Sequence, residues 1–362
     1  MIRASHREYL ADAIRWVDDT YVDPVAALTA GIGMSGPVLL AAATGDAAPG
    51  LAAALGSLMI GGIPAATTLR DQARQLLTVL VPAVAATVVA AVIAGHGWLT
   101  DVAMIVLVAL SALLGGLGRL AAVVTTLFNL YLIIVLAVAV PETGHLRFAA
   151  LVLAGSLWTI VVGVALGAAA RWCRRQAGRG DTGGSAHRQA PRPTRPRSHA
   201  RWRRSLRRPE GWQFPIRLAA CLGIAVVLRW LWPDDHLHWI ALTVALLSSR
   251  EIEAFPVKLT QRALGTALGV AATSLLLLFD LPGFAMAAGI GVLAAARPML
   301  RARNYLAYSA VMTPLVVVVM DAGRPLDADV LIDRLVATLI GAGLVIAANA
   351  VAGRLLVSRG MV

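Results

Sequence analysis

The sequence predicts an all-α protein that crosses a membrane about twelve times, with its helices arranged as two parallel six-helix repeats. The chain is 58% hydrophobic and only 14% charged, whereas soluble domains are about 45–50% apolar. Its mean hydropathy is +0.74. Apolar windows of the length that spans a bilayer, about 20 residues, recur from residue 25 almost to the C-terminus. These observations exclude an ordinary cytosolic globular protein.

The apolar windows divide into two sets of six on either side of a polar stretch. In the first set we expect spans over residues 25–44, 50–67, 76–94, 102–117, 120–140 and 148–170. In the second set we expect them over 215–232, 238–249, 263–279, 282–296, 305–320 and 335–357.

These windows divide the chain into four parts. Residues 1–24 form a polar, amphipathic segment without the apolar core of a cleavable signal peptide. Residues 25–170 and 213–362 form the two membrane halves. Between them, residues 171–212 are rich in Arg and Pro and nearly free of aliphatic side chains. Such a segment cannot bury enough apolar surface to fold alone, so we expect a disordered linker.

The distribution of charge predicts the orientation in the membrane. The net charge of +12 is concentrated in the linker and in alternate loops, while most acidic residues fall in the other loops. By the positive-inside rule the N-terminus, the linker and the C-terminus are cytoplasmic, as in a multi-pass protein of the bacterial inner membrane. We interpret the charge as a topology signal and expect no nucleic-acid partner. The linker arginines could also attract anionic lipids.

An internal repeat is suggested by matched basic pairs. A shift of 188 positions places Arg70 on Lys258 and Arg74 on Arg262. The spacing within each pair puts both charges on one face of a helix. Two parallel halves would be related by an axis along the membrane normal.

Candidate substrate-binding residues cluster around the second span of each half. That span is broken by Gly and Pro in the first half and is unusually short in the second, and transporter sites often form at such spans. Ser57, Thr243, Ser248 and Ser249 add hydroxyl groups there, and we expect Ser57, Thr243 and Ser248 to contact the substrate. The alternative is that small residues here only permit close helix packing.

Two arginines complete the candidate site. Arg74 and Arg262 precede the third apolar window of each half, where we expect a helix N-terminus to add partial positive charge. We expect them to capture an anion from the cytoplasm, with Thr266 in the same helix as Arg262. The alternative is an anchoring role at lipid phosphates.

Charged residues at other boundaries have simpler interpretations. Arg229 lies one turn inside an expected outer boundary, and snorkelling to the interface would explain it. No span carries a central Asp or Glu, so any proton coupling would use boundary groups such as Asp101, His238, Asp280 and Asp333.

The sequence contains no phosphate-binding loop, no H-E-x-x-H and no G-x-S-x-G motif. We therefore expect neither an enzyme nor a cofactor. The two cysteines show no metal-ligand spacing and are expected to be free thiols.

Several motifs resemble those of the FUSC family, the fusaric acid resistance and aromatic acid exporter group of membrane proteins. They are Trp239-x-x-Leu242-Thr243, a loop with Pro256, Arg262-x-x-Gly265-Thr266-x-x-Gly269, Asn304-Tyr305 followed by Thr313-Pro314, and Arg334-x-x-x-Thr338-x-x-Gly341. The resemblance implies two six-span halves and efflux of small organic anions driven by an ion gradient. Related plant proteins are malate-type anion channels. Longer members carry a folded cytosolic domain where this chain has its Arg-rich linker.

Three functional hypotheses follow. The first is an inner-membrane exporter of small, aromatic-carboxylate-type anions, and the second is an anion channel. The third is a membrane scaffold of a cell-envelope assembly that docks through its basic linker. A homo-oligomer is compatible with each hypothesis.

Overall fold

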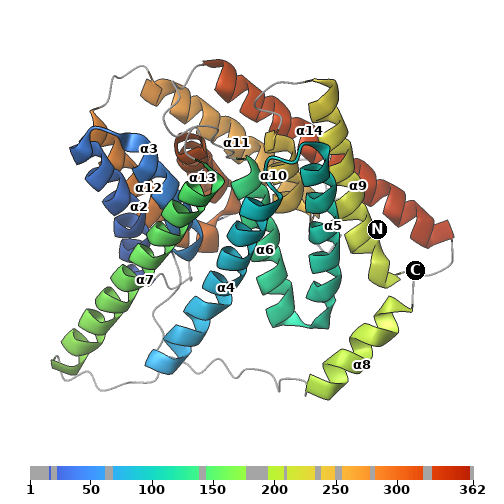
Figure 1. The fold of residues 1–362 in the computed structure, drawn as a ribbon, viewed down its shortest axis with the longest axis horizontal. Coiled ribbons are helices and arrows are strands. Elements are labelled where there is room, and N and C mark those ends of the chain that lie inside the picture. The colour runs from blue at the N-terminus through green and yellow to red at the C-terminus, as the bar shows by residue number, and fades with distance from the viewer. Residues whose placement is uncertain are drawn as a thin grey trace.

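Every element in the described part of the chain is helical (Figure 1). The computed structural model describes residues 16–17, 23–61, 68–137, 144–176, 195–207, 210–232, 238–248, 255–277, 282–320 and 328–358. The first group of helices is α2 Pro24–Thr44, α3 Ala47–Ile60, α4 Leu69–Ile93, α5 Trp98–Leu114 with the 3₁₀ turn η1 Gly115–Leu117, α6 Arg119–Ala137 and α7 His145–Gln176. Then follow α8 Arg195–Leu206, α9 Glu210–Leu231, α10 His238–Leu247, α11 Phe255–Leu277, α12 Gly283–Arg303, α13 Tyr305–Met320 and α14 Ala328–Ser358.

A helix occupies most or all of each apolar window in the sequence. In the described residues, eight helices are long and apolar enough to cross a bilayer. The chain is therefore a multi-pass helical membrane protein, while twelve spans and two repeats stay predictions. The second helix of the second set is short, as expected, with 10 residues in α10. In the first set α3 has 14 residues and ends at Ile60, within the 50–67 window. The amphipathic segment at residues 1–24 lies largely outside the described residues.

Several helices begin or end well beyond the apolar windows, because a helix can continue into the aqueous phase where charged side chains are solvated. α7 has 32 residues, roughly 48 Å of helix, which exceeds a bilayer core of about 30 Å. α4 begins at Leu69, where Thr68 caps it by accepting a hydrogen bond from the Asp71 N–H at 3.1 Å. α11 begins at Phe255.

Consequently Arg74 and Arg262 lie more than one turn inside their helices. The expectation that each sits at a helix N-terminus beside free backbone N–H groups is wrong, because those groups belong to the first turn.

The linker contains a helix where we expected disorder. α8 spans Arg195–Leu206 and packs against η1 and α9. The indole N–H of Trp202 donates to the carbonyl oxygen of Leu113 at 3.0 Å. This contact with the end of α5 is the physical reason that an isolated polar segment becomes ordered. The prediction of disorder is therefore wrong for α8, and residues 177–194 lie outside the described residues.

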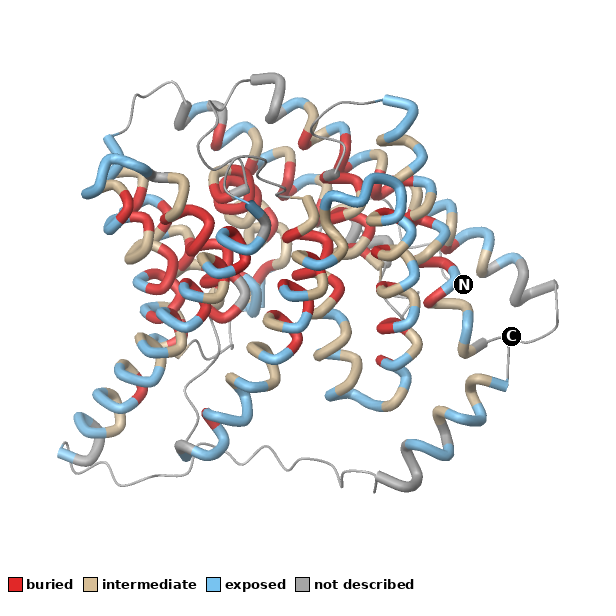
Figure 2. Tube along the Cα trace, viewed as in Figure 1, coloured by how far each residue is buried: buried red, intermediate tan, exposed pale blue. Residues whose placement is uncertain are grey.

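Exposed residues occur along the outer helices (Figure 2), and many of them are large and apolar. On α5, for example, Val102, Val106 and Leu110 recur every fourth residue and are each about half exposed. In every one of the eight apolar helices, less than two fifths of the apolar window is buried. Extended apolar surface of this kind is stable against lipid and not against water.

Helix packing follows the same order in the two sets. Within α2–α7, α3 packs on α2 and α7, and α4 packs on α6 and α7. Within α9–α14, α10 packs on α9 and α14, and α11 packs on α13 and α14. Between the sets, α2 contacts α12, α5 contacts α9, α3 contacts α13 and α6 contacts α10.

The crossing of α3 and α7 is built from two Gly-Ser pairs. Ser57 donates to the carbonyl oxygen of Gly155 at 3.0 Å, and Ser156 donates to that of Gly56 at 3.2 Å. A Cβ at Gly155 would overlap the carbonyl group of Ala53, and one at Gly56 would overlap that of Val152. Small residues therefore bring the two backbones into direct contact.

Gly155→Ala should destabilise the protein by about 1 to 3 kcal/mol, because the new methyl group has no room between α3 and α7. Gly223→Ala is the matched control, since a Cβ there meets nothing within 4 Å, and better helix propensity should leave stability equal or slightly higher. Thermal unfolding in detergent measures both. Equal midpoints for the two variants would contradict the close α3–α7 contact.

The native cysteines provide a test of orientation. Cys173 is exposed at the end of α7 and Cys221 is buried. A membrane-impermeant maleimide should therefore spare Cys173 in intact cells and label it after permeabilisation. His96→Cys in a Cys173→Ser background, in the exposed turn after α4, should be labelled from outside. Labelling of Cys173 in intact cells would overturn the predicted topology.

A candidate anion site between α5 and α9

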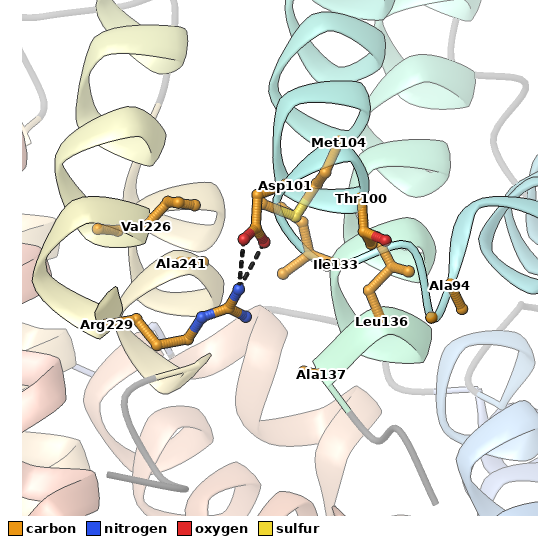
Figure 3. Close-up of a pocket in the computed structure, with 13 residues that line it drawn as sticks. Ala94, Thr100, Asp101, Met104, Ile133, Leu136, Ala137, Val226, Arg229 and Ala241 are labelled. Atoms are coloured by element: carbon orange, nitrogen blue, oxygen red, sulfur yellow. Dashed lines mark hydrogen bonds and ion pairs between the residues drawn. The ribbon is translucent and has the colours of Figure 1, made fainter. Parts of the chain in front are cut away.

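A cavity of about 260 Å³ lies where helices of the two sets meet (Figure 3). One side is formed by the α4–α5 turn, α5 and the end of α6, and the other by the end of α9 and the start of α10. The lining residues are Ala94, Gly95, Gly97, Thr100, Asp101, Met104, Ile133, Leu136, Ala137, Ala225, Val226, Arg229 and Ala241. In the predicted topology all of these helix ends face outward.

The polar centre of the cavity is an ion pair between Arg229 and Asp101. Nη2 of Arg229 lies 2.6 Å from Oδ1 and 2.7 Å from Oδ2 of Asp101. The indole N–H of Trp230 donates to Oδ2 at 2.9 Å. The Asp101 side chain is 7% exposed and the Arg229 side chain 39%, so the guanidinium group is the accessible member of the pair.

Helix ends favour both charges. Asp101 lies in the first turn of α5 and Arg229 in the last turn of α9. The partial positive charge at a helix N-terminus stabilises the carboxylate, and the partial negative charge at a C-terminus stabilises the guanidinium group. The turn before α5 contains Gly95 and Gly97, both with positive φ. Glycine permits this backbone, which brings the start of α5 back beside the end of α4.

The rest of the wall is mainly apolar. Met104, Ile133, Leu136 and Val226 surround the ion pair. A low-polarity wall strengthens any hydrogen bond that a ligand makes with the guanidinium group. The arrangement suits a small ligand that has one anionic group and an apolar body.

The residues singled out from the sequence lie elsewhere. Ser57 is fully buried and donates to Gly155, so it has a packing role in the α3–α7 crossing. Arg74 is exposed on α4, and Ser248 is half-buried at the end of α10. None of the six predicted substrate-binding residues lines the cavity.

Three of the predicted residues remain unexplained by packing alone. Thr243 Oγ1, Arg262 Nε and Thr266 Oγ1 are buried and have no hydrogen-bond partner within the part of the chain that the structure describes. By contrast, Thr159 and Thr273 donate to the carbonyl oxygens four residues earlier. Buried polar atoms are rarely left unsatisfied, so each of these three needs a partner such as water or ligand.

The R-x-x-G-T-x-x-G motif also has a packing function. A Cβ at Gly265 would lie 2.5 Å from the Leu306 carbonyl oxygen, and one at Gly269 would lie 2.6 Å from that of Ala310. These glycines therefore let α11 approach α13. Elsewhere, the Arg334 guanidinium group lies 3.8 Å from the Trp239 ring centroid, which joins two motifs that are distant in sequence through a cation–π contact.

The sequence does not predict the ion pair between Arg229 and Asp101. It indicates a snorkelling side chain at Arg229 and a boundary carboxylate at Asp101. The interpretation of Arg229 is wrong, since it pairs with Asp101. The sequence feature that could have indicated the pair is the presence of opposite charges at the outer boundaries of two apolar spans.

Removing one member of the pair should cost more stability than removing both. Asp101→Asn or Arg229→Gln should each lower the free energy of unfolding by about 1 to 3 kcal/mol, because the remaining group loses a charge-assisted hydrogen bond. The double variant should recover part of the loss. Denaturation of the four proteins in detergent measures the coupling, with exposed Arg119→Gln as the control. Strict additivity would show that the pair contributes nothing.

Comparisons with known proteins give one result. Residues 222–348 match the family described as fusaric acid resistance protein-like, which confirms the resemblance of the sequence motifs. No curated protein and no solved structure matches the chain. The match includes Arg229 and α10–α13, and leaves α2–α7 outside. Residues 222–348 of this multi-pass membrane protein are therefore similar to the fusaric acid resistance protein-like family.

Proposed function

We propose that the protein exports small organic anions of the aromatic carboxylate type across the bacterial inner membrane by secondary transport. The observation that carries this proposal is the accessible guanidinium group of Arg229 in a mainly apolar cavity. Arginine suits this task because its planar donors match a carboxylate. The apolar wall would receive the ring of the substrate.

We also infer that α2–α7 and α9–α14 are two parallel repeats. The support is the matched packing order, in which α2 corresponds to α9 and each later helix to its counterpart. Exchange of the sets converts the α5–α9 contact into the α12–α2 contact and the α6–α10 contact into the α13–α3 contact. In transporters with internal repeats, substrate sites lie at the repeat interface, which is where this cavity lies.

The size of the cavity limits the substrate. Its volume of about 260 Å³ is just below the range of roughly 300–1,000 Å³ for drug-sized ligand sites. A single substituted ring with one carboxylate is therefore a better fit than a polycyclic compound.

We propose that the buried polar atoms of Thr243, Arg262 and Thr266 form a first binding site, which the substrate occupies before it reaches the Arg229 cavity. Their support is burial without a partner and the predicted position of Arg262 toward the cytoplasm. Arg74 is exposed and would only attract the substrate anion to the protein surface. A substrate would be captured on this side and released from the Arg229 cavity on the other.

A scaffold role has one specific observation in its favour. α8 exposes Arg203 and Arg204, while Trp202 attaches the helix to the end of α5. Each arginine near an anionic lipid surface contributes about 1 kcal/mol of attraction. We propose that α8 contacts anionic lipid headgroups, which is compatible with transport as well as with a scaffold.

Counterflow in proteoliposomes tests the transport proposal. Labelled benzoate should accumulate transiently against an excess of internal unlabelled benzoate, and Arg229→Gln should abolish this uptake. Arg119→Gln, an exposed arginine outside the cavity, should behave like the wild type. Flux without counterflow would indicate a channel, and the absence of any flux would favour the scaffold.

Arg262→Gln should weaken the apparent affinity for substrate by roughly 1 to 3 kcal/mol, the scale of a charge-assisted hydrogen bond. Arg262→Lys should recover only part of the loss, because a point charge cannot reproduce bidentate binding. Arg70→Gln, on the exposed part of α4, is the control. Normal transport by Arg262→Gln at limiting substrate would assign this arginine to packing or topology.

A further inference from the structure

We propose that Asp101 is a built-in competitor for the substrate, so that an anion binds Arg229 only by displacing the Asp101 carboxylate. This inference rests on the proposed function and concerns the regulation of the same site. It assigns to Asp101 a role in setting affinity and selectivity, and to Trp230 the role of holding Asp101 after displacement.

The first argument is one of charge. Arg229 and Asp101 together are neutral, and both carboxylate oxygens lie on the same nitrogen, Nη2. Among the described residues, no other ionisable side chain lines the cavity. A substrate anion therefore meets no net positive charge while the pair is intact. Its full attraction to the guanidinium group appears only when Asp101 has moved away.

The second argument is one of chemical equivalence. The Asp101 carboxylate occupies Nη2, one of the guanidinium nitrogens that a substrate carboxylate would use. Exchange of one carboxylate for another keeps the number of charge-assisted hydrogen bonds on Arg229 nearly constant. The exchange then depends on the apolar body of the substrate, which can bury surface against Met104, Ile133 and Leu136. Small inorganic anions lack such a body and would displace Asp101 poorly.

The third argument concerns the fate of the displaced carboxylate. A carboxylate of 7% exposure cannot be left without a donor, because an unpaired buried charge is costly. The indole N–H of Trp230 already donates to Oδ2 of Asp101 at 2.9 Å. This donor is independent of Arg229. The indole can therefore retain Asp101 while Arg229 turns toward the substrate. Trp230 thus lowers the cost of exchange.

Three isosteric or near-isosteric variants separate the possible outcomes. The measurement is benzoate affinity of the purified full-length protein in detergent, by isothermal titration calorimetry, with benzyl alcohol as the uncharged analogue. Size-exclusion chromatography first establishes that each variant is monodisperse. The variants are Asp101→Asn, Trp230→Phe and Arg229→Gln.

Competition predicts opposite effects at the two partners of Arg229. Asp101→Asn should bind benzoate roughly tenfold or more tightly than the wild type, because release of Arg229 no longer breaks a charged pair. Trp230→Phe should bind several-fold more weakly, because the displaced Asp101 loses its second donor. Neither change should alter the response to benzyl alcohol. Binding detected in Asp101→Asn but not in the wild type would support the proposal in its strongest form.

Other results overturn distinct statements. If Arg229→Gln loses benzoate binding and Asp101→Asn also weakens it, Asp101 orients Arg229 and does not compete, while the proposed site stands. If Trp230→Phe binds more tightly, Trp230 does not receive the displaced carboxylate. If Arg229→Gln binds like the wild type, or if neither the wild type nor Asp101→Asn binds, the cavity is not the carboxylate site and the proposed function fails there.

Discussion

The structure depends on close contact between helices that gain nothing from the hydrophobic effect by meeting one another in lipid. The reciprocal hydrogen bonds of Ser57 with Gly155 and of Ser156 with Gly56 meet this requirement at the α3–α7 crossing. Glycine removes the side chains that would separate the backbones, and each serine then reaches the opposite carbonyl oxygen. α10 and α14 use a related contact, since a Cβ at Gly341 would lie 2.9 Å from Cβ of Thr243. Each of these crossings joins the second and the last helix of its set.

Two contacts between the sets differ in the groups that join the helices. At the α2–α12 contact, a Cβ at Gly31 would lie 3.0 Å from the Gly291 carbonyl oxygen, and the backbones approach closely. At the corresponding α5–α9 contact, Asp101 and Arg229 join the helix ends beside a cavity. A cavity therefore accompanies the ion pair at the α5–α9 contact, whereas glycine allows direct backbone approach at the α2–α12 contact.

Electrostatics explain why the cavity carries a pair of opposite charges. An isolated guanidinium group near the hydrocarbon region is expensive, whereas a paired one satisfies its hydrogen bonds within the protein. In the proposed exchange, the same pair keeps the site neutral until a substrate anion displaces the Asp101 carboxylate. Stability of the empty protein and restraint on anion binding therefore come from one contact. Trp230 contributes to both, because its indole N–H donates to the same carboxylate.

The fold class, the apolar windows and the short second helix of the second set could be predicted from the sequence, because each depends on local composition and periodicity. The family resemblance of residues 222–348 could be recognised for a related reason, since the R-x-x-G-T-x-x-G motif depends only on local spacing. The helix in the linker could not, because α8 is ordered by the contact of Trp202 with Leu113, which is remote in sequence. The candidate site could not be predicted from the sequence for the same reason. Asp101 and Arg229 lie 128 positions apart, and their pairing exists only because α5 packs on α9. Local sequence determines where helices form and what charge each end carries, whereas the tertiary structure decides which ends meet.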